Sequence, residues 1–526
     1  MTDAPIVQTE VGHLAGTTVV TEHGPAHRFA GVPFGAAPIG PDRFRRARPA
    51  PPWDGVRPDG FGPSPMQTVS GPFSGVVPGM AVTQVDEDCL TLNVWRPAEP
   101  AGEPRPVLVW IYGGAFVTGG SALATYDGAR LCAEQGVMVV TVNYRIGALG
   151  FLDLRSVPGG NSTDANCGLT DQLLALEWVQ QHIDRFGGDP ARVTVFGESA
   201  GAGSIMHLLT APGIDSVVRR AIVQSPGIDF TQTAELSAVV AETFLACAGA
   251  STVDDLRAIP AARLVEIQDA VASELLFDVG TMVFHPVVDG SVVPATPSLA
   301  ITGGAAREVD VIMGYTTDEM RLFPDPRADA LDDDGLATWV RSYLTFRMGR
   351  DPGDGAPRAL VRAYADAMTG SARSKGSDLW AAIQTDGIMR QPVLRVADSR
   401  RDAVPTFVYQ FEWAARRPSD DFGAFHAIEL PFVFDAFDVD GWDVFVGADA
   451  GARELARAMR SAWAAFAAIG DPSGGDLGAW PRYDPLNRST MVLGERCRVV
   501  DDPLASERQW WSGLWDPAGR PAGVPR

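Results

Sequence analysis

Six short runs of apolar, largely β-branched residues recur along this chain, and the segments between them carry glycine-containing loops and helical spacing of apolar residues. A strand that is apolar throughout has to be buried on both faces, which is the pattern of parallel sheets. This pattern therefore predicts an α/β fold with a large, mostly parallel central sheet flanked by helices. The six runs are Val107–Tyr112, Val137–Asn143, Arg192–Phe196, Ala221–Gln224, Val309–Gly314 and Thr406–Phe411.

Two segments between or after these runs have the spacing of amphipathic helices. The segment from Asp171 carries apolar residues at intervals of three and four and stops at Gly187. The segment Glu454–Ile469 has a similar apolar stripe and ends at Gly470. Glycine favours the left-handed conformation that ends many helices, so both stops are expected. We interpret both apolar stripes as core that covers a face of the sheet.

The chain length, 526 residues, would by itself suggest three or four domains at about 150 residues each. No linker rich in proline or serine divides the chain, however, and no internal repeat is found. The weakly patterned stretches at roughly 227–305 and 320–400 read as insertions into one domain. We therefore expect a single domain over residues 1–526, with helical insertions around the entrance to its active site.

Charge and cysteine content exclude several classes of protein. Asp and Glu outnumber Lys and Arg by 65 to 43, and a net charge of -22 repels nucleic acids and anionic membranes. The five cysteines show no CxxC spacing, so neither a zinc site nor a disulfide scaffold is predicted. No apolar stretch is long enough for a membrane span, and the N-terminal residues do not resemble a secretory signal. We expect a cytoplasmic protein.

Ser199 is the candidate nucleophile. It lies in the string Gly197-Glu198-Ser199-Ala200-Gly201, which follows the predicted strand RVTVF directly and precedes a helical segment rich in small residues. The pattern G-x-S-x-G between a strand and a helix is typical of a nucleophile elbow, a sharp turn that exposes a serine hydroxyl. The alternative is a glycine-rich turn with an incidental serine, and the strand-to-helix context argues against it.

The order of residues along the chain selects the partners of this serine. In hydrolases with such an elbow the acid follows the serine and the histidine follows the acid. Only His285 and His426 come after Ser199, and only His426 also follows the acids Asp318 and Glu319 at the end of a predicted strand. His426 is therefore the predicted base. The residues alone leave Asp318 and Glu319 as equal candidates for the acid.

The loop Gly113-Gly114-Ala115-Phe116 follows the strand Val107–Tyr112 and is the candidate source of backbone N–H groups. An oxyanion that forms during acyl transfer needs fixed donors, commonly the amide after the nucleophile and amides of such a loop. Ala200 supplies the first of these. The alternative is an ordinary glycine turn that closes a strand, but the position of the loop before an elbow serine favours the functional interpretation.

Seven motifs in order along the chain resemble those of the type-B carboxylesterase family of α/β-hydrolases, which includes bacterial p-nitrobenzyl esterases and the cholinesterases. The resemblance extends over nearly the whole chain. The motifs span residues 29–49, 87–97, 110–119, 143–152, 168–202, 314–323 and 423–434.

The resemblance implies roles for individual residues. It makes Ser199 the nucleophile, His426 the general base and acid, and Glu319 rather than Asp318 the third member of a catalytic triad. Oxyanion donors would be the amides of Gly114, Ala115 and Ala200. Glu198 and Ser225 would join a buried polar network around His426, in a role as readily structural as catalytic. The pairs Arg43–Glu87 and Arg145–Asp171 resemble ion pairs that stabilise the family fold.

Two departures from the family pattern narrow these expectations. Many relatives pair the cysteine of EDCL with an upstream cysteine, whereas Pro65 and Met66 stand in that place here, so we expect Cys89 to be a free thiol. Cholinesterases hold the quaternary ammonium of choline on a tryptophan just before EDCL, by cation–π attraction. The segment at 76–90 contains no aromatic residue, so choline esters are not expected as the preferred substrate.

The expected activity is hydrolysis of carboxylic esters through an acyl-enzyme, with no metal and no organic cofactor. The expected partner is a small-molecule ester, and the protein would be a monomer or a homodimer. The same mechanism on amide, carbamate or lactone bonds is one alternative, and a non-catalytic binding or adhesion module of the same fold is another. Four residues of the insertions and nearby loops are candidates for the substrate pocket, namely Phe73, Phe284, Leu322 and Phe323.

Overall fold

The computed structural model describes residues 4–69, 77–100, 102–276, 282–348, 351–401, 404–417, 421–439 and 441–514. A twisted sheet of eleven strands crosses this part of the chain, in the order β16-β15-β14-β13-β12-β11-β9-β10-β8-β4-β3. The strands are β3 (Thr17–Thr21), β4 (Gly24–Pro33), β8 (Thr91–Pro97), β9 (Arg105–Ile111), β10 (Met138–Val142), β11 (Gly188–Glu198), β12 (Arg220–Gln224), β13 (Asp310–Thr316), β14 (Thr406–Phe411), β15 (Ser489–Leu493) and β16 (Arg498–Asp501).

The run from β10 through β9, β11, β12, β13 and β14 to β15 is parallel, and the pairs at the two ends of the sheet are antiparallel. All six predicted strands are confirmed, with ends that differ by a few residues at most. Every residue of β10, β12, β13 and β14 is buried, as continuous apolar runs predict. Two small sheets lie apart from this one: β1 (Ile6–Gln8), β2 (His13–Ala15) and β5 (Val56–Arg57) form the first, and β6 (Ser64–Pro65) and β7 (Val85–Asp86) the second.

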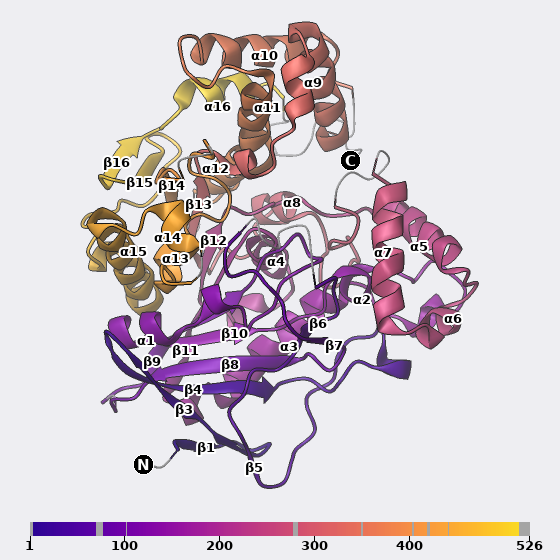
Figure 1. Ribbon diagram of the computed structural model, residues 1–526, viewed down its shortest axis with the longest axis vertical. Coiled ribbons are helices and arrows are strands. Elements are labelled where there is room, and N and C mark those ends of the chain that lie inside the picture. The colour runs from indigo at the N-terminus through magenta and orange to yellow at the C-terminus, as the bar shows by residue number, and fades with distance from the viewer. Residues whose placement is uncertain are drawn as a thin grey trace.

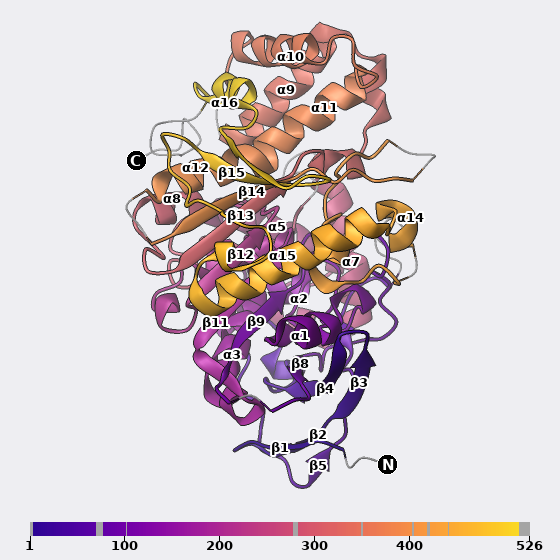
Figure 2. The same cartoon turned by 90° about the vertical axis from the view of Figure 1, so that its left-hand side faces the viewer.

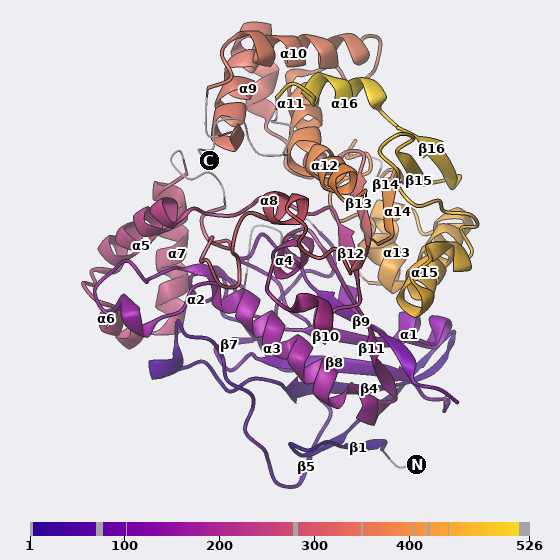
Figure 3. The same cartoon turned by 180° about the vertical axis from the view of Figure 1, so that it is seen from behind.

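Helices cover both faces of the central sheet. Figure 2 shows α1 (Ala129–Gln135) and α15 (Ala450–Ile469) across one face. Figure 3 shows α3 (Cys167–His182) and α4 (Ala200–Leu208) on the opposite side. Burial on two faces explains why the central strands carry apolar residues at most positions. The predicted fold class, a mostly parallel sheet between layers of helices, is confirmed.

Both helices predicted from apolar spacing are present, and both begin four residues earlier than the spacing showed. Helix α3 starts at Cys167 and passes through a 3₁₀ turn, Ile183–Phe186, to Gly187, whose φ is 92°. Helix α15 starts at Ala450, because the carboxylate of Asp449 accepts a hydrogen bond from the Ala452 amide at its N-terminus. It ends at Gly470 with a φ of 78°. The first four residues of each helix are mostly small or polar, so the spacing of apolar residues did not indicate where the helix begins.

The two stretches interpreted as insertions are largely helical in their described parts. Residues 227–305 contain α5 (Ala234–Ala248), α6 (Val253–Ala258), α7 (Ala261–Glu274) and α8 (Pro297–Thr302). Residues 320–400 contain α9 (Asp333–Met348), α10 (Gly355–Ala367), α11 (Gly376–Thr385) and α12 (Gln391–Ser399). In Figure 1, α9, α10 and α11 stand above the sheet together with α16 (Ala505–Trp511), around a small hydrophobic cluster of their own.

Two ion pairs, one buried and one partly buried, link distant segments, as the family resemblance implied. Arg145 donates to both carboxylate oxygens of Asp171, at 2.7 and 2.8 Å, and Asp171 is fully buried. Arg43 donates to Glu87 at 2.6 and 2.7 Å. Removing one partner of such a pair leaves an uncompensated buried charge, so both pairs hold their segments in place.

Cys89 is a free thiol, as expected, and it is buried. The other four cysteines are free thiols as well. It lines a small internal space together with Pro65 and Met66, the residues that replace the upstream cysteine of many relatives. Burial raises the pKa of the Cys89 thiol well above its usual range. In the described part of the chain, none of the helices has both the length and the apolar composition required to cross a membrane.

Candidate active site

Ser199 stands at the turn between β11 and α4 with a φ of 56° and a ψ of -125°. This conformation is rare for a residue with a side chain and marks stored strain at a functional site. The glycines on either side make the turn possible. A Cβ atom at Gly197 would lie 2.6 Å from the carbonyl oxygen of Ile111, and one at Gly201 would lie 2.0 Å from the same atom. The G-x-S-x-G string is thus required by the close approach of β9 to the elbow.

His426 lies in the segment that leads into α13 (Leu430–Phe434), with only 6% of its surface exposed. Its Nε2 atom is 2.7 Å from Ser199 Oγ, and its Nδ1 atom is 2.6 Å from Glu319 Oε2. Because a carboxylate only accepts hydrogen bonds, we assign the proton to Nδ1 and the free lone pair to Nε2. In that tautomer Nε2 can accept the serine proton. The structure thus brings Ser199, His426 and Glu319 into contact, although each is at least 107 residues from the others in the sequence.

The two neighbouring acids that the sequence left open lie in different surroundings. Glu319 is fully buried, and its Oε1 atom accepts a hydrogen bond from the Thr316 amide while Oε2 meets His426. Asp318 instead pairs with Arg373 at 2.8 Å and accepts a hydrogen bond from the Ala424 amide. Asp318 therefore holds the loop before His426 in place, and Glu319 is the acid that contacts the imidazole.

Glu198 brings a second carboxylate to the same imidazole. Its Oε1 atom is 3.2 Å from His426 Nε2, an ion-pair distance, and this oxygen has no hydrogen-bond partner among the described residues. Burial raises the pKa of Glu198, and the negative charge of Glu319 raises it further. Burial alone would lower the pKa of His426, but Glu198 and Glu319 outweigh it and raise that pKa above its ordinary value. The charge of each of these two groups therefore affects the protonation of the other.

Glu429, which the sequence reasoning missed, is a third buried carboxyl beside His426. It is completely buried, and neither of its oxygens has a hydrogen-bond partner in the described part of the chain. Burial raises the pKa of Glu429, and the charges of Glu198 and Glu319 add to the effect. A signal was present in the sequence, because Glu429 is the only acid within the apolar segment at 424–434, three positions after the predicted base.

Ser225, expected in the polar network around His426, is fully buried and follows β12 with a φ of 48°. Its amide donates to the Gly314 carbonyl oxygen at 2.9 Å, but its hydroxyl has no hydrogen-bond partner among the described residues. No hydrogen bond therefore joins this hydroxyl to the polar groups around His426 among the described residues. Ser225 contributes its backbone to the join between β12 and β13.

The expected oxyanion donors lie on the other side of Ser199. Gly114 and Ala115 have positive φ values of 117° and 53°, and a Cβ at Gly113 would lie 2.9 Å from the Cβ of Ser199. The loop therefore passes directly against the nucleophile, which only glycine at Gly113 permits. Within the described residues, no hydrogen bond runs from the amides of Gly114, Ala115 or Ala200 to another protein group. The three amides therefore have no protein acceptor in this part of the chain.

The candidate pocket residues and the rejected base His285 lie elsewhere in the fold. The ring of Phe323 lies 6.0 Å from that of His426, centroid to centroid, and Leu322 and Phe284 are buried. Phe73 lies outside the described residues. His285, the rejected base, is buried, and burial together with His207 lowers its pKa to about 4, so it is a neutral packed side chain.

Among the described residues, one group of side chains has the spacing of a metal site: Glu22, His23 and Asp435. It does not include Ser199 or its partners. Arg130 lies 3.3 Å from Glu22, and Arg460 lies 3.4 Å from Asp435, so each carboxylate already faces a positive charge. The group is an ion-pair network that joins the N-terminal hairpin to the turn after α13.

Comparison with known proteins gives one consistent result. The sequence model of the Carboxylesterase family matches residues 3–511. The para-nitrobenzyl esterase of Bacillus subtilis is 33% identical over 512 residues, which are 96% of this chain and 98% of the relative. The phenmedipham hydrolase of Pseudarthrobacter oxydans is 33% identical, with the same coverage. A solved PNB esterase structure superposes with a TM-score of 0.83 at 33% identity and covers 96% of this chain and 99% of its own.

Proposed function

This chain belongs to the carboxylesterase family and is a carboxylic ester hydrolase, and from that premise we propose that it works through an acyl-enzyme formed on Ser199. The contact that carries the proposal is the continuous line from Ser199 Oγ to His426 Nε2, at 2.7 Å, and from His426 Nδ1 to Glu319 Oε2, at 2.6 Å. A nucleophile, a base and an orienting acid within hydrogen-bonding distance form the arrangement that acyl transfer requires.

In the first half of the reaction, Ser199 Oγ attacks the ester carbonyl carbon while its proton moves to His426 Nε2. The carbonyl oxygen becomes an oxyanion, which the amides of Gly114, Ala115 and Ala200 stabilise. The tetrahedral intermediate then collapses, and the bond to the alcohol oxygen breaks as His426 Nε2 returns its proton to that oxygen. The alcohol leaves, and the acyl group stays on Ser199.

In the second half, water takes the place of the alcohol. His426 Nε2 accepts a proton from the attacking water, the oxyanion forms again in the same place, and collapse releases the acid and restores Ser199. Glu319 keeps the imidazole in the tautomer that presents a free Nε2 atom and stabilises the imidazolium that forms in each half. No step needs a metal or an organic cofactor.

The proposal is tested with the Ser199→Ala variant and a series of p-nitrophenyl esters from acetate to decanoate. We expect hydrolysis to fall by about 10⁴-fold or more, because the triad acts as a unit. Ser216→Ala is the matched control, since Ser216 is an exposed serine whose hydroxyl bonds only to the nearby Gly213 carbonyl oxygen. Unchanged hydrolysis by Ser199→Ala would overturn the mechanism.

The same ester series measures the size of the substrate pocket, and a matching amide series shows which kinds of bond the enzyme cleaves. The chain length with the highest kcat/KM measures the space that the acyl group occupies. The matching p-nitroanilides measure activity on amides, and we propose that esters are the preferred substrates. If the anilides are hydrolysed as fast as the esters, amides become the proposed substrates, and the proposed role of Ser199 is unchanged.

A further inference from the structure

The loop that carries the proposed oxyanion donors has an unusual backbone. Three successive residues, Gly114, Ala115 and Phe116, have positive φ values of 117°, 53° and 61°. For the two residues that carry a side chain, this conformation costs free energy and persists only where the surroundings hold it. Residues 113–119 belong to no helix or strand of the described structure. Other contacts must therefore keep this loop in the shape that presents its amides beside Ser199.

Hydrogen bonds and close packing within the loop tie its two ends together. The Gly114 carbonyl oxygen accepts from the amides of Val117 and Thr118, both at 3.0 Å. A Cβ atom at Gly114 would lie 2.2 Å from the Thr118 carbonyl oxygen, and one at Gly119 would lie 2.8 Å from the Gly113 carbonyl oxygen. The two arms of the loop thus lie directly against each other. A displacement of Thr118 or Gly119 therefore also displaces the neighbouring donor amides.

Gln67 holds the end of this loop with its side-chain amide. The Nε2 atom donates to the carbonyl oxygens of Pro65, at 2.9 Å, and Gly119, at 2.6 Å. The Oε1 atom accepts from the Gly119 amide and from the Thr118 hydroxyl, both at 2.8 Å. The Gly119 N–H can meet only an acceptor, so it fixes the orientation of the glutamine amide. Only 4% of Gln67 is exposed, so water has little access to these four hydrogen bonds.

Gln67 bonds to both backbone groups of Gly119, as a neighbouring strand would. Without this side chain, the N–H and C=O of Gly119 and the hydroxyl of Thr118 would lose the partners that they have among the described residues. Unpaired buried polar groups are costly, so the loop would move until water or other groups satisfied them. The shape of the donor loop therefore depends on a side chain from a segment about 50 positions earlier in the chain.

From these contacts we propose that Gln67 is a positioning residue for the stabilisation of the oxyanion. Its hydrogen bonds do not reach the catalytic triad. It acts by fixing Thr118 and Gly119, and through them the amides of Gly114 and Ala115. The inference rests on the proposed acyl-enzyme mechanism, in which these amides stabilise the negative oxygen. Because an oxyanion forms in both halves of that reaction, Gln67 supports acylation and deacylation alike.

Steady-state kinetics with p-nitrophenyl butyrate test this role. Gln67→Met keeps the length of the side chain and removes its hydrogen bonds, so we expect kcat to fall by about 10- to 100-fold while KM stays within about twofold. The loss is smaller than the loss expected from removal of a donor, because the amides are displaced and still present. KM is expected to stay because acylation and deacylation slow together.

Two further variants separate positioning from folding. Gln180→Met is the matched control, since Gln180 Nε2 on α3 also donates to two carbonyl oxygens, those of Pro190 at 2.9 Å and Val217 at 2.8 Å. Its kcat should stay within about twofold of that of the unaltered protein. Gln67→Glu keeps an oxygen that accepts from the loop, so its kcat should lie between those of Gln67→Met and the unaltered protein. If Gln67→Met does not fold, Gln67→Glu replaces it, with kcat lowered at least about threefold and KM unchanged.

A pair of ketone inhibitors measures the binding of the oxyanion directly. With 1,1,1-trifluoro-2-heptanone, a bond forms from Ser199 Oγ to the carbonyl carbon, the serine proton moves to His426 Nε2, and the carbonyl oxygen becomes an oxyanion. 2-Heptanone has nearly the same shape and binds without that step. In Gln67→Met, the inhibition constant of the trifluoroketone should rise by about 10- to 100-fold, in parallel with the fall in kcat, and that of 2-heptanone should change by less than about twofold.

The outcomes distinguish this inference from the proposed function. The inference is wrong if the Gln67 variant keeps the kcat of the unaltered protein, or if Gln67→Met and Gln180→Met lose kcat equally. It is also wrong if the two ketones lose affinity by the same factor, because Gln67 then shapes the whole site and not the oxyanion donors. Retained hydrolysis by Ser199→Ala would contradict the acyl-enzyme mechanism itself, whatever the result for Gln67.

Discussion

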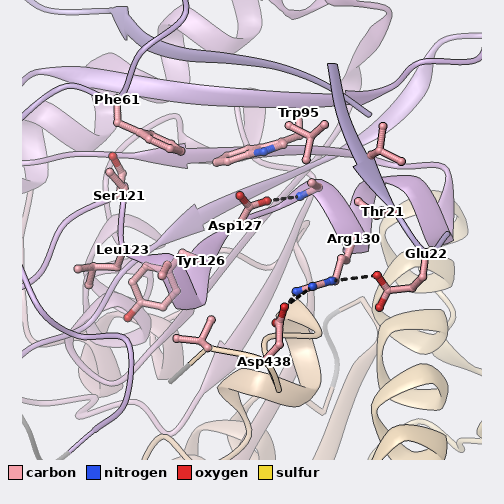
Figure 4. A pocket seen from close by; sticks show the side chains of 16 residues that line it. Thr21, Glu22, Phe61, Trp95, Ser121, Leu123, Tyr126, Asp127, Arg130 and Asp438 are labelled. Atoms are coloured by element: carbon pink, nitrogen blue, oxygen red, sulfur yellow. Dashed lines mark hydrogen bonds and ion pairs between the residues drawn. The ribbon is translucent and has the colours of Figure 1, made fainter. Parts of the chain in front are cut away.

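Two groups of carboxyl side chains in this protein lie in opposite electrostatic environments. Beside His426, Glu198 and Glu429 are buried with no ion pair to an arginine in the described part of the chain, and burial raises the pKa of each. At the surface beside α1, Asp438 meets Arg130 (Figure 4), and the hydrogen bonds from that guanidinium lower the pKa of Asp438. The comparison shows that the surroundings decide whether a carboxyl holds a charge or a proton at neutral pH, since the ionising group is the same.

The difference has a functional reason in the proposed mechanism. His426 must give and accept protons, so carboxyls of raised pKa next to it can exchange protons in the same pH range. Arg130 and Asp438 remain ionised throughout that range and hold two segments together.

Replacing Glu319 with glutamine should have the largest effect. The variant keeps the shape of the side chain but loses the charge that orients the imidazole and stabilises its protonated form, so kcat should fall by about 10³- to 10⁴-fold. The measurement is steady-state kinetics with p-nitrophenyl butyrate. Asp318→Asn is the control, because the asparagine keeps an acceptor oxygen and residue 318 does not contact the imidazole. This variant should retain most of the activity. Similar losses in both variants would remove the distinction between the two acids.

Replacing Glu198 with glutamine should shift the pH dependence of the reaction. His426 must be neutral to accept the serine proton, and because its pKa is raised, activity should be lost on the acid side at a pH above that of a free imidazole. Glu198→Gln removes a negative charge 3.2 Å from Nε2, so the acid limb of kcat/KM should move to lower pH by about one unit. A limb that stays in place would show that Glu198 is already protonated in the active enzyme.

Replacing Glu429 with glutamine should change how stability depends on pH. The folded pKa of Glu429 is raised, so the folded state holds a proton that the unfolded state has lost above about pH 4.5. The unaltered protein should therefore lose stability as the pH rises from 5 towards 8, and the variant should lose about 1 to 2 kcal/mol less over that range. Urea unfolding at several pH values measures the difference. Parallel curves for the two proteins would contradict the raised pKa.

Replacing Asp438 with asparagine should have the smallest effect. The carboxylate is 63% exposed and its partner Arg130 is 28% exposed, so solvent screens the pair. The free energy of unfolding should fall by less than about 1 kcal/mol, and esterase activity should not change. High salt should reduce even this difference. For comparison, Asp171→Asn breaks the buried pair with Arg145 and should cost on the order of 3 kcal/mol or more. An equal loss in Asp438→Asn would show that exposure does not explain the difference between the two ion pairs.

The sequence determined the architecture and the order of its parts. Apolar runs at 107–112 and 309–314 must be buried on both faces, and this local requirement predicts the parallel sheet that the structure contains. Gly197 and Gly201 around Ser199 signal a turn that no other residues allow. His426 followed from chain order alone. These properties depend on side chains and backbone within a few positions of one another, so they can be read along the chain.

The tertiary structure decided what depends on distance between remote segments. Asp318 and Glu319 are chemically similar neighbours, and only the docking of the His426 segment places Glu319 Oε2 2.6 Å from Nδ1 while Asp318 meets Arg373. The raised pKa of Glu429 and the unpartnered hydroxyl of Ser225 arise from burial against other elements. Burial and Coulomb interactions act through space, so the order of residues does not contain them.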